Sequence, residues 1–157
     1  GGRRNLEGGN TEVLARMIAE LIDCNVQRIE ATDPYSASYD ATVARNVAEQ
    51  NADARPAIAD PLASIEQYDT VLLGSPIWNV RPPMIMSTFA EAFDFTGKTV
   101  HPFVTYAVSG LGSTQRVYTE ACFGARLGDG LAVRGEEVTQ HRGDVETWLR
   151  DGGLLTT

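Results

Sequence analysis

The stretch from Thr70 to Pro83 constrains the fold most, because it begins as a buried strand and ends as a stiff loop. Residues 71–73 form a continuous apolar run, Val-Leu-Leu, which is typical of a strand covered on both faces in a parallel sheet. Pro82 and Pro83 prevent the strand from continuing and favour the first turn of a helix. Since such a strand needs helices on both of its faces, the stretch indicates an α/β protein.

Amphipathic and apolar segments alternate along the rest of the chain. Apolar residues recur at helical spacing in five segments and form short apolar runs in three further segments. The expected helices cover about 11–23, 39–50 and 83–93, and two more begin after Ser113 and Asp144; the expected strands cover 25–31, 99–108 and 131–133. The expected N-caps are Asn10 or Thr11, Ser113 and Asp144. This alternation predicts one parallel sheet with helices on both faces, in a single domain over residues 1–157.

The composition limits the classes of partner. The net charge is -8, so no dense cationic face is available for phosphates, and nucleic acid is not expected as a partner. An acidic surface permits docking to a basic protein, and it also simply aids solubility. No apolar run is long enough for a membrane span. Cys24 and Cys122 belong to no C-x-x-C motif, which favours two reduced, buried thiols in a cytoplasmic protein over a metal site or a redox dithiol.

Three loops are expected at the carboxyl edge of the sheet, where open α/β sheets bind ligands. The glycine-rich loop at 8–11 leads into a helix N-terminus, which suits an anion, although it also reads as a flexible start with a helix cap. Trp78 in the loop 75–79 is either a platform for a flat ring or a cover for the core. The glycines in the loop 109–113 allow a backbone to approach a ligand closely.

The sequences Pro-Ile-Trp at 76–78 and Ser-Gly-Leu-Gly-Ser at 109–113, each after an apolar strand, resemble the flavodoxin-like family. The resemblance covers nearly the whole chain. It implies a flavodoxin-like three-layer sandwich and non-covalently bound flavin mononucleotide (FMN). The implied cofactor-binding residues are Gly9, Asn10 and Thr11 for the phosphate, Ser75, Pro76, Ile77, Trp78 and Asn79 for one side of the ring, and Ser109, Gly110 and Gly112 for the other side and the polar edge.

The start of the sequence departs from the family. The family begins with an apolar strand that precedes the phosphate loop and is central in the strand order 2-1-3-4-5, whereas no apolar segment precedes Gly9 here. Three explanations are open: a fragment of a longer product, a strand donated by another chain through swapping, or a rearranged sheet that no longer binds flavin. Unpaired residues on the strands near Val26 and Val71 would help to decide.

The resemblance allows two functions for an FMN protein. One is an electron carrier that docks to a redox partner protein, and the other is an NAD(P)H-dependent reductase of a small quinone-like acceptor or flavin. A flavin-free binding module of the same fold is the alternative from another class. A homodimer or a strand-swapped dimer is compatible with each. No catalytic residue or metal ligand can be singled out: His101 reads as structural, His141 as solvated, and Arg81 as a surface residue or an anion contact.

Overall fold

A parallel sheet lies at the centre of the computed structural model, which describes residues 9–156. Its strands are β3 (Thr70–Pro76), β4 (Thr99–Tyr106), β5 (Arg126–Leu127) and β6 (Leu131–Arg134). β3 pairs with β4 in parallel over its whole length, from Thr70 opposite Thr99 to Pro76 opposite Thr105. β5 and β6 both pair with β4, also in parallel. The ladder between β3 and β4 therefore brings the ends of the two longest strands to one edge.

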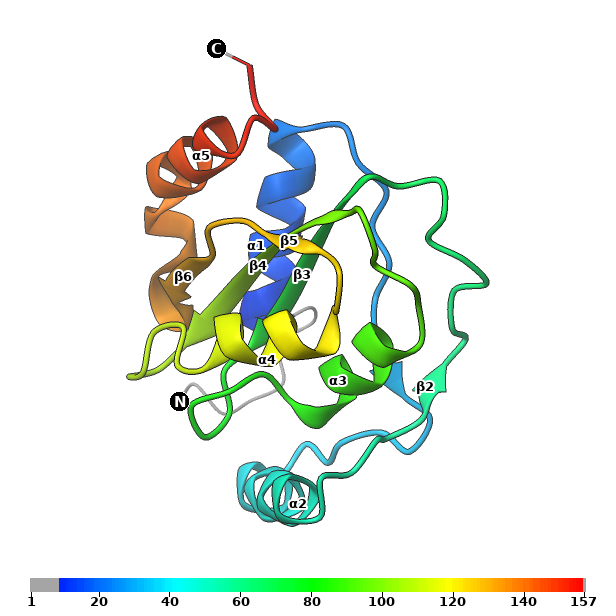
Figure 1. The fold of residues 1–157 in the computed structure, drawn as a ribbon. Coiled ribbons are helices and arrows are strands. Elements are labelled where there is room, and N and C mark those ends of the chain that lie inside the picture. Colours follow the sequence, from blue (N-terminus) through cyan, green and yellow to red (C-terminus); the bar gives the residue numbers. More distant parts are fainter. Residues whose placement is uncertain (1–8, 157) are drawn as a thin grey trace.

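Helices cover both faces of this sheet (Figure 1), as predicted. The bounds are α1 (Gly9–Leu21) and α5 (Arg142–Asp151) on one face, and α3 (Met84–Glu91) and α4 (Thr114–Ala121) on the other. Leu14 of α1 and Leu149 of α5 are fully buried in one core, together with Phe103 of β4. Ala90 of α3 and Tyr118 of α4 are fully buried in the second core. The helices thus sandwich the sheet between two apolar layers.

A glycine in β3 makes room for an aromatic ring in β4. Gly74 lies opposite Phe103 in the register, and a Cβ atom on Gly74 would come within 2.1 Å of the Phe103 ring. The ring in turn packs edge-on against Trp148 of α5, with ring centroids 6.2 Å apart. Glycine normally weakens a strand, so here its lack of a side chain serves the packing of the core.

The prediction that residues 25–31 form a strand of the main sheet is wrong. Only β1 (Glu30–Ala31) is a strand, and it pairs antiparallel with β2 (Ile58–Ala59) in a separate two-stranded sheet. Val26 is 60% exposed and lies outside every described strand. Within residues 9–156, β3 has a strand partner on one edge only, so this part of the chain shows the unpaired strand edge that was expected near Val71. The parallel pairing of β3, β4 and β6 agrees with the predicted parallel sheet.

Several local predictions need correction at helix starts. α1 begins at Gly9, so Asn10 and Thr11 lie in its first turn and are not caps. Likewise α5 begins at Arg142, and Asp144 lies in its first turn. There the Asp144 carboxylate is 2.7 Å from Nδ1 of His141, while Glu137, in the 3₁₀ helix η1 (Gly135–Gln140), is 3.3 Å from Nε2. His141 is therefore not simply solvated, and these two carboxylates raise its pKa.

The structure confirms the predictions for residues 39–50 and His101 and contradicts one of the two predictions for the cysteines. The predicted helix at 39–50 is present as α2 (Tyr39–Asn51). His101 is structural as predicted: it is buried and packs edge-on against Trp148. Cys122 is buried but Cys24 is exposed, so only one of the two thiols was placed correctly. Every helix within residues 9–156 is too short or too polar to cross a bilayer.

Replacement of Gly74 by alanine is expected to lower the free energy of unfolding by about 1–3 kcal/mol, because the new methyl group overlaps the Phe103 ring. Gly143 in α5 is the matched control, since no atom lies within 4 Å of the position of its Cβ. Gly143→Ala should leave stability unchanged or raise it by up to about 1 kcal/mol. Urea unfolding of both variants measures the difference, and equal midpoints would contradict this account of the core.

Candidate functional site

The three loops singled out from the sequence meet at the carboxyl edge of the sheet. Thr11 in the first turn of α1 lies 2.7 Å from Thr105 near the end of β4, measured between the two hydroxyl oxygens. The loop after β3 reaches the loop after β4 through a hydrogen bond of 2.8 Å from the backbone amide of Ser113 to the carbonyl of Val80. The parallel register produces this meeting, because β3 and β4 end side by side.

A tight turn at 78–81 forms the centre of this rim. The amide of Trp78 donates to the carbonyl of Arg81 at 2.9 Å, and the amide of Arg81 donates back to Trp78 at 3.3 Å. Asn79 and Val80 both have left-handed backbones, with φ of 51° and 61°. This pattern is a type I′ turn, in which asparagine followed by glycine is favoured. A β-branched residue such as Val80 is a rare occupant of that conformation, so the turn is strained.

Neighbouring segments hold the turn at the carbonyl groups of Trp78 and Val80. The carbonyl of Trp78 accepts from Nε2 of Gln50 in α2 at 2.9 Å, and Nδ2 of Asn79 donates to Oε1 of Gln50 at 2.8 Å. The carbonyl of Val80 accepts from both the amide and the hydroxyl of Ser113, at 2.8 and 3.2 Å. Ser113 was predicted to cap α4, but its hydroxyl makes no cap bond and serves the turn.

The two glycines of the third loop have different surroundings. Gly112 has φ of 55°, and a Cβ atom there would lie 2.1 Å from the carbonyl oxygen of Val80. The close approach that its lack of a side chain permits is thus made to the turn of the second loop. Gly110 has φ of 60°, and nothing lies within 4 Å of its Cβ position. Of the two, Gly110 is the one that leaves open space for a ligand.

Trp78 is half-buried, so it is neither sealed in the core nor free in solvent. Its ring packs edge-on against Tyr35, with centroids 5.3 Å apart and planes at 70°. The guanidinium of Arg45 lies 3.8 Å from the centre of the Tyr35 ring. The Tyr35 hydroxyl donates to Glu49 at 2.6 Å, and burial together with this carboxylate raises the pKa of the phenol. Tyr35 is therefore a packing residue, and it supports Trp78.

The other predicted residues differ in their access to the rim. Ser75 is 2% exposed and its hydroxyl donates to the carbonyl of Pro76, so it offers little surface to a ligand. The half-buried Ile77 continues the ladder through its amide, which donates to Thr105 at 2.9 Å. Asn10 is exposed and lies against Gly135. Half-buried Ser109 accepts from the amide of Gly112 at 3.1 Å.

The remaining charged candidate, Arg81, is turned away from the rim. Its Nη2 lies 3.4 Å from the hydroxyl of Ser87 in α3, and its Nε lies 3.3 Å from the carbonyl of Pro82. Sequence reasoning missed Gln50 altogether. A polar residue near the end of an amphipathic helix carries no signal that it reaches another loop, so only the structure identifies it.

The donor set at the rim suits a planar ring with an anionic tail. The first turn of α1 presents amide groups that have no partner within the helix, at the positive end of the helix dipole. A half-buried tryptophan and an unobstructed glycine backbone stand beside it. Among residues 9–156, no group of three His, Cys, Asp or Glu side chains could hold a metal ion.

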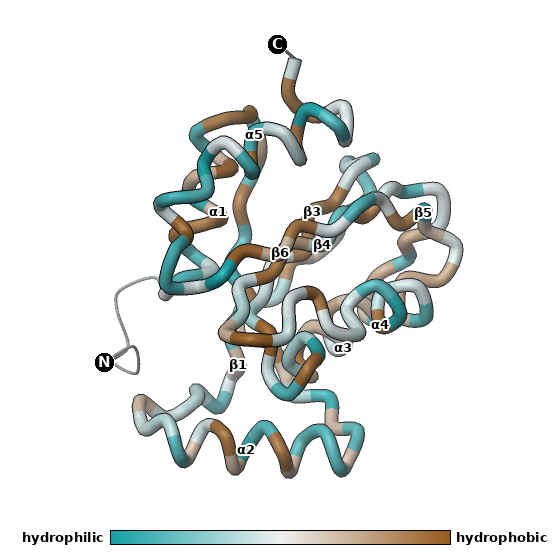
Figure 2. Tube along the Cα trace, turned by 90° about the vertical axis from the view of Figure 1, so that its left-hand side faces the viewer, coloured by the Kyte–Doolittle hydropathy of each residue, from teal (hydrophilic) through white to brown (hydrophobic). Residues whose placement is uncertain are grey.

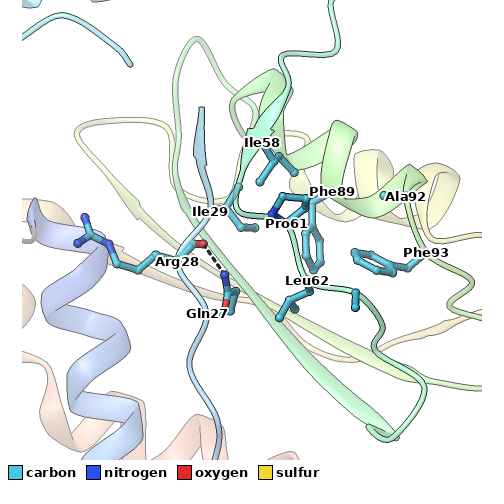
Figure 3. Close-up of a pocket in the computed structure, with 10 residues that line it drawn as sticks. Gln27, Arg28, Ile29, Ile58, Pro61, Leu62, Phe89, Ala92 and Phe93 are labelled. Carbon is cyan, nitrogen blue, oxygen red and sulfur yellow. Dashed lines mark hydrogen bonds between the residues drawn. The ribbon is translucent and has the colours of Figure 1, made fainter. Parts of the chain in front are cut away.

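Two cavities lie apart from this rim. One of about 200 Å³ is lined by Ile29, Ile58, Leu62, Phe89 and Phe93, between the small sheet and α3 (Figure 3). The other, of about 270 Å³, lies beside Arg45 and Glu49. Neither is lined by a residue of the three loops, so we do not connect them with the site.

Comparison with known proteins identifies the family. The sequence model of the flavodoxin family matches residues 6–151, so the chain belongs to this family. No curated protein matched the chain. A candidate flavoprotein from Bacteroides uniformis has 31% sequence identity and a TM-score of 0.71, with 83% of this chain and 88% of that chain covered.

Two further solved structures share the fold. A candidate flavoprotein from Bacteroides eggerthii is 26% identical with a TM-score of 0.75, covering 91% of this chain and 90% of its own. A flavoprotein from Lactobacillus acidophilus, solved in complex with FMN, is 21% identical with a TM-score of 0.64, covering 83% of this chain and 89% of its own. At 21% identity, the similarity to the Lactobacillus acidophilus protein supports the fold alone.

Replacement of Val80 by glycine is expected to raise the free energy of unfolding by about 1 kcal/mol, since glycine adopts the left-handed conformation without strain. Little packing is lost, because Val80 is 54% exposed. Val26, which is 60% exposed and has no left-handed backbone, is the control. Val26→Gly should lower stability through the greater freedom of the unfolded chain. If urea unfolding gives both substitutions the same sign, the turn is not strained.

Proposed function

We propose that this protein binds FMN at the rim formed by the three loops and uses it in electron transfer. The observation that carries the proposal is the half-buried Trp78 on a turn held next to the third loop, with the first turn of α1 at the same edge. Membership of the flavodoxin family and a structural neighbour crystallised with FMN support the choice of cofactor. We propose Gly9, Asn10 and Thr11 for the phosphate and the second and third loops for the two sides of the ring.

The chain's own residues would bind and orient the cofactor. The amides of the first turn of α1 and the hydroxyl of Thr11 would hold the phosphate, because they supply donors at the positive end of the helix dipole. Trp78 would stack on the ring, and the backbone at Gly110 would approach its polar edge. When bound, the flavin supplies the electron chemistry. The net charge of -8 disfavours additional negative charge on the ring.

The acidic charge favours a carrier that docks to a basic redox partner protein. One observation favours a second candidate, a reductase of small quinone-like acceptors: Val80 and Val108, which are 54% and 87% exposed, place apolar side chains directly next to the second and third loops. Steady-state oxidation of NAD(P)H with a quinone present separates the two, since a carrier gives no turnover.

The two cysteines form no disulfide, which fits the cytoplasmic location that we also propose.

Purified protein is expected to bind FMN with a flavin absorption spectrum and a raised melting temperature. Trp78→Ala should weaken FMN binding about two- to thirteenfold, because ring stacking contributes about 0.5–1.5 kcal/mol. Phe123→Ala is the matched aromatic control, since Phe123 is 84% exposed and belongs to none of the three loops. Fluorescence titration measures the dissociation constants. Colourless protein without a thermal shift would instead support a flavin-free module.

Thr11→Ala is expected to weaken FMN binding several-fold while leaving riboflavin binding nearly unchanged, because riboflavin lacks the phosphate that the hydroxyl would contact. Thr11→Ser keeps the hydroxyl and should bind FMN like the natural sequence. Parallel titrations with both ligands measure the ratio of the two dissociation constants. An equal loss for FMN and riboflavin would contradict the assignment of Thr11 to the phosphate.

A further inference from the structure

Helix α2 contributes little apolar packing to the protein. Asn46 is its only buried residue within the described structure, and Tyr39, Val43 and Val47 are 53%, 43% and 42% exposed. The helix lies beyond the end of α3, away from the central sheet (Figures 1 and 2). A surface helix normally gains its place by burying an apolar stripe. The position of α2 must therefore depend largely on its polar contacts.

Three side chains of α2 make polar contacts that lead to Trp78, directly or through Tyr35. Gln50 donates to the carbonyl of Trp78 at 2.9 Å and accepts from Nδ2 of Asn79 at 2.8 Å. In the same helix, Glu49 directly before Gln50 forms an ion pair with Arg45 at 2.9 Å, and both contact Tyr35. Tyr35 then packs edge-on against the Trp78 ring. The helix thus contacts the backbone of Trp78 directly and the Trp78 ring through Tyr35.

We propose that Gln50 is a positioning residue that sets the orientation of Trp78, with α2 as its support. The amide side chain suits this role, because it offers a donor and an acceptor at once and the turn presents the complementary pair. Both bonds fix the turn at its first two residues, and Ser113 fixes it from the other side at Val80. Loss of the Gln50 bonds leaves Trp78 held by its backbone bonds with Arg81 and by its packing on Tyr35. The consequence for flavin binding rests on the function proposed above.

The first test uses the protein without flavin. The chain has two tryptophans, so a Trp148→Phe background leaves Trp78 as the only one. Gln50→Ala in this background should increase quenching of Trp78 fluorescence by acrylamide about twofold and speed hydrogen exchange of the Trp78 amide. Alanine favours helix, so α2 itself should persist in circular dichroism. Gln27→Ala, at an exposed glutamine outside the helices and strands, is the control and should change neither signal.

Two further substitutions test the two hydrogen bonds of Gln50 separately. Gln50→Glu keeps the acceptor for Asn79 but loses the donor to Trp78, and Asn79→Ala removes only the other bond. Each should give a smaller increase in quenching than Gln50→Ala. Gln50→Ala combined with Asn79→Ala should add little to Gln50→Ala alone, because the second bond is already lost. Additive effects, or unchanged quenching in Gln50→Ala, would overturn the proposal.

The second test uses flavin. Because Trp78 faces the ring and not the phosphate in the proposed arrangement, Gln50→Ala should weaken FMN and riboflavin binding by the same factor, about two- to fivefold and no more than Trp78→Ala does. General loosening of the fold would also disturb the first turn of α1 and change the ratio between the two ligands, which would overturn a specific role in positioning Trp78. If the natural sequence binds neither ligand, the proposed function fails, whereas the role of Gln50 in orienting Trp78 is still decided by the quenching measurement.

Discussion

The parallel ladder between β3 and β4 is the interaction on which the rest of the structure depends. Seven residues of β3 are in register with β4, and the two strands end together. Their loops must therefore leave the sheet side by side, and α1 begins at the same edge, where Thr11 meets Thr105. Gly74 allows this ladder to carry the Phe103 ring in its core. The site is a consequence of strand register, with no special motif needed to bring its parts together.

The contacts around the turn at 78–81 hold its backbone in a strained conformation. Val80 adopts a backbone that few β-branched residues accept, and neighbours bind the carbonyl groups on either side of the turn. Gly112 can lie against Val80 only because it lacks a side chain. Strained backbone persists where the surroundings over-determine it, and such places are frequent at binding sites. The rim is thus built before any ligand arrives.

The sequence predicted the elements with long apolar periodicity well. The central strand at Thr70, the helices of both layers and the meeting of three loops follow from apolar spacing and from the geometry of parallel sheets. The prediction of a strand at 25–31 was wrong, because Val26 and Ile29 alone do not distinguish a strand from exposed coil. Gln50 and the bonds of Ser113 could not be foreseen, since a side-chain contact between distant segments leaves no trace in local spacing.

Because α2 has few buried apolar contacts, the lifetime of a bound molecule and the melting temperature of the protein need not change together. The sheet and its four covering helices hold the two cores, whereas α2 adds a single buried side chain, Asn46. Regions with few buried apolar contacts open locally at a small fraction of the global free energy of unfolding. Brief detachment of α2 would free the tryptophan edge of the rim while the cores remain closed. The lifetime of a bound molecule could then be tuned by changes in α2 that leave the melting temperature almost constant.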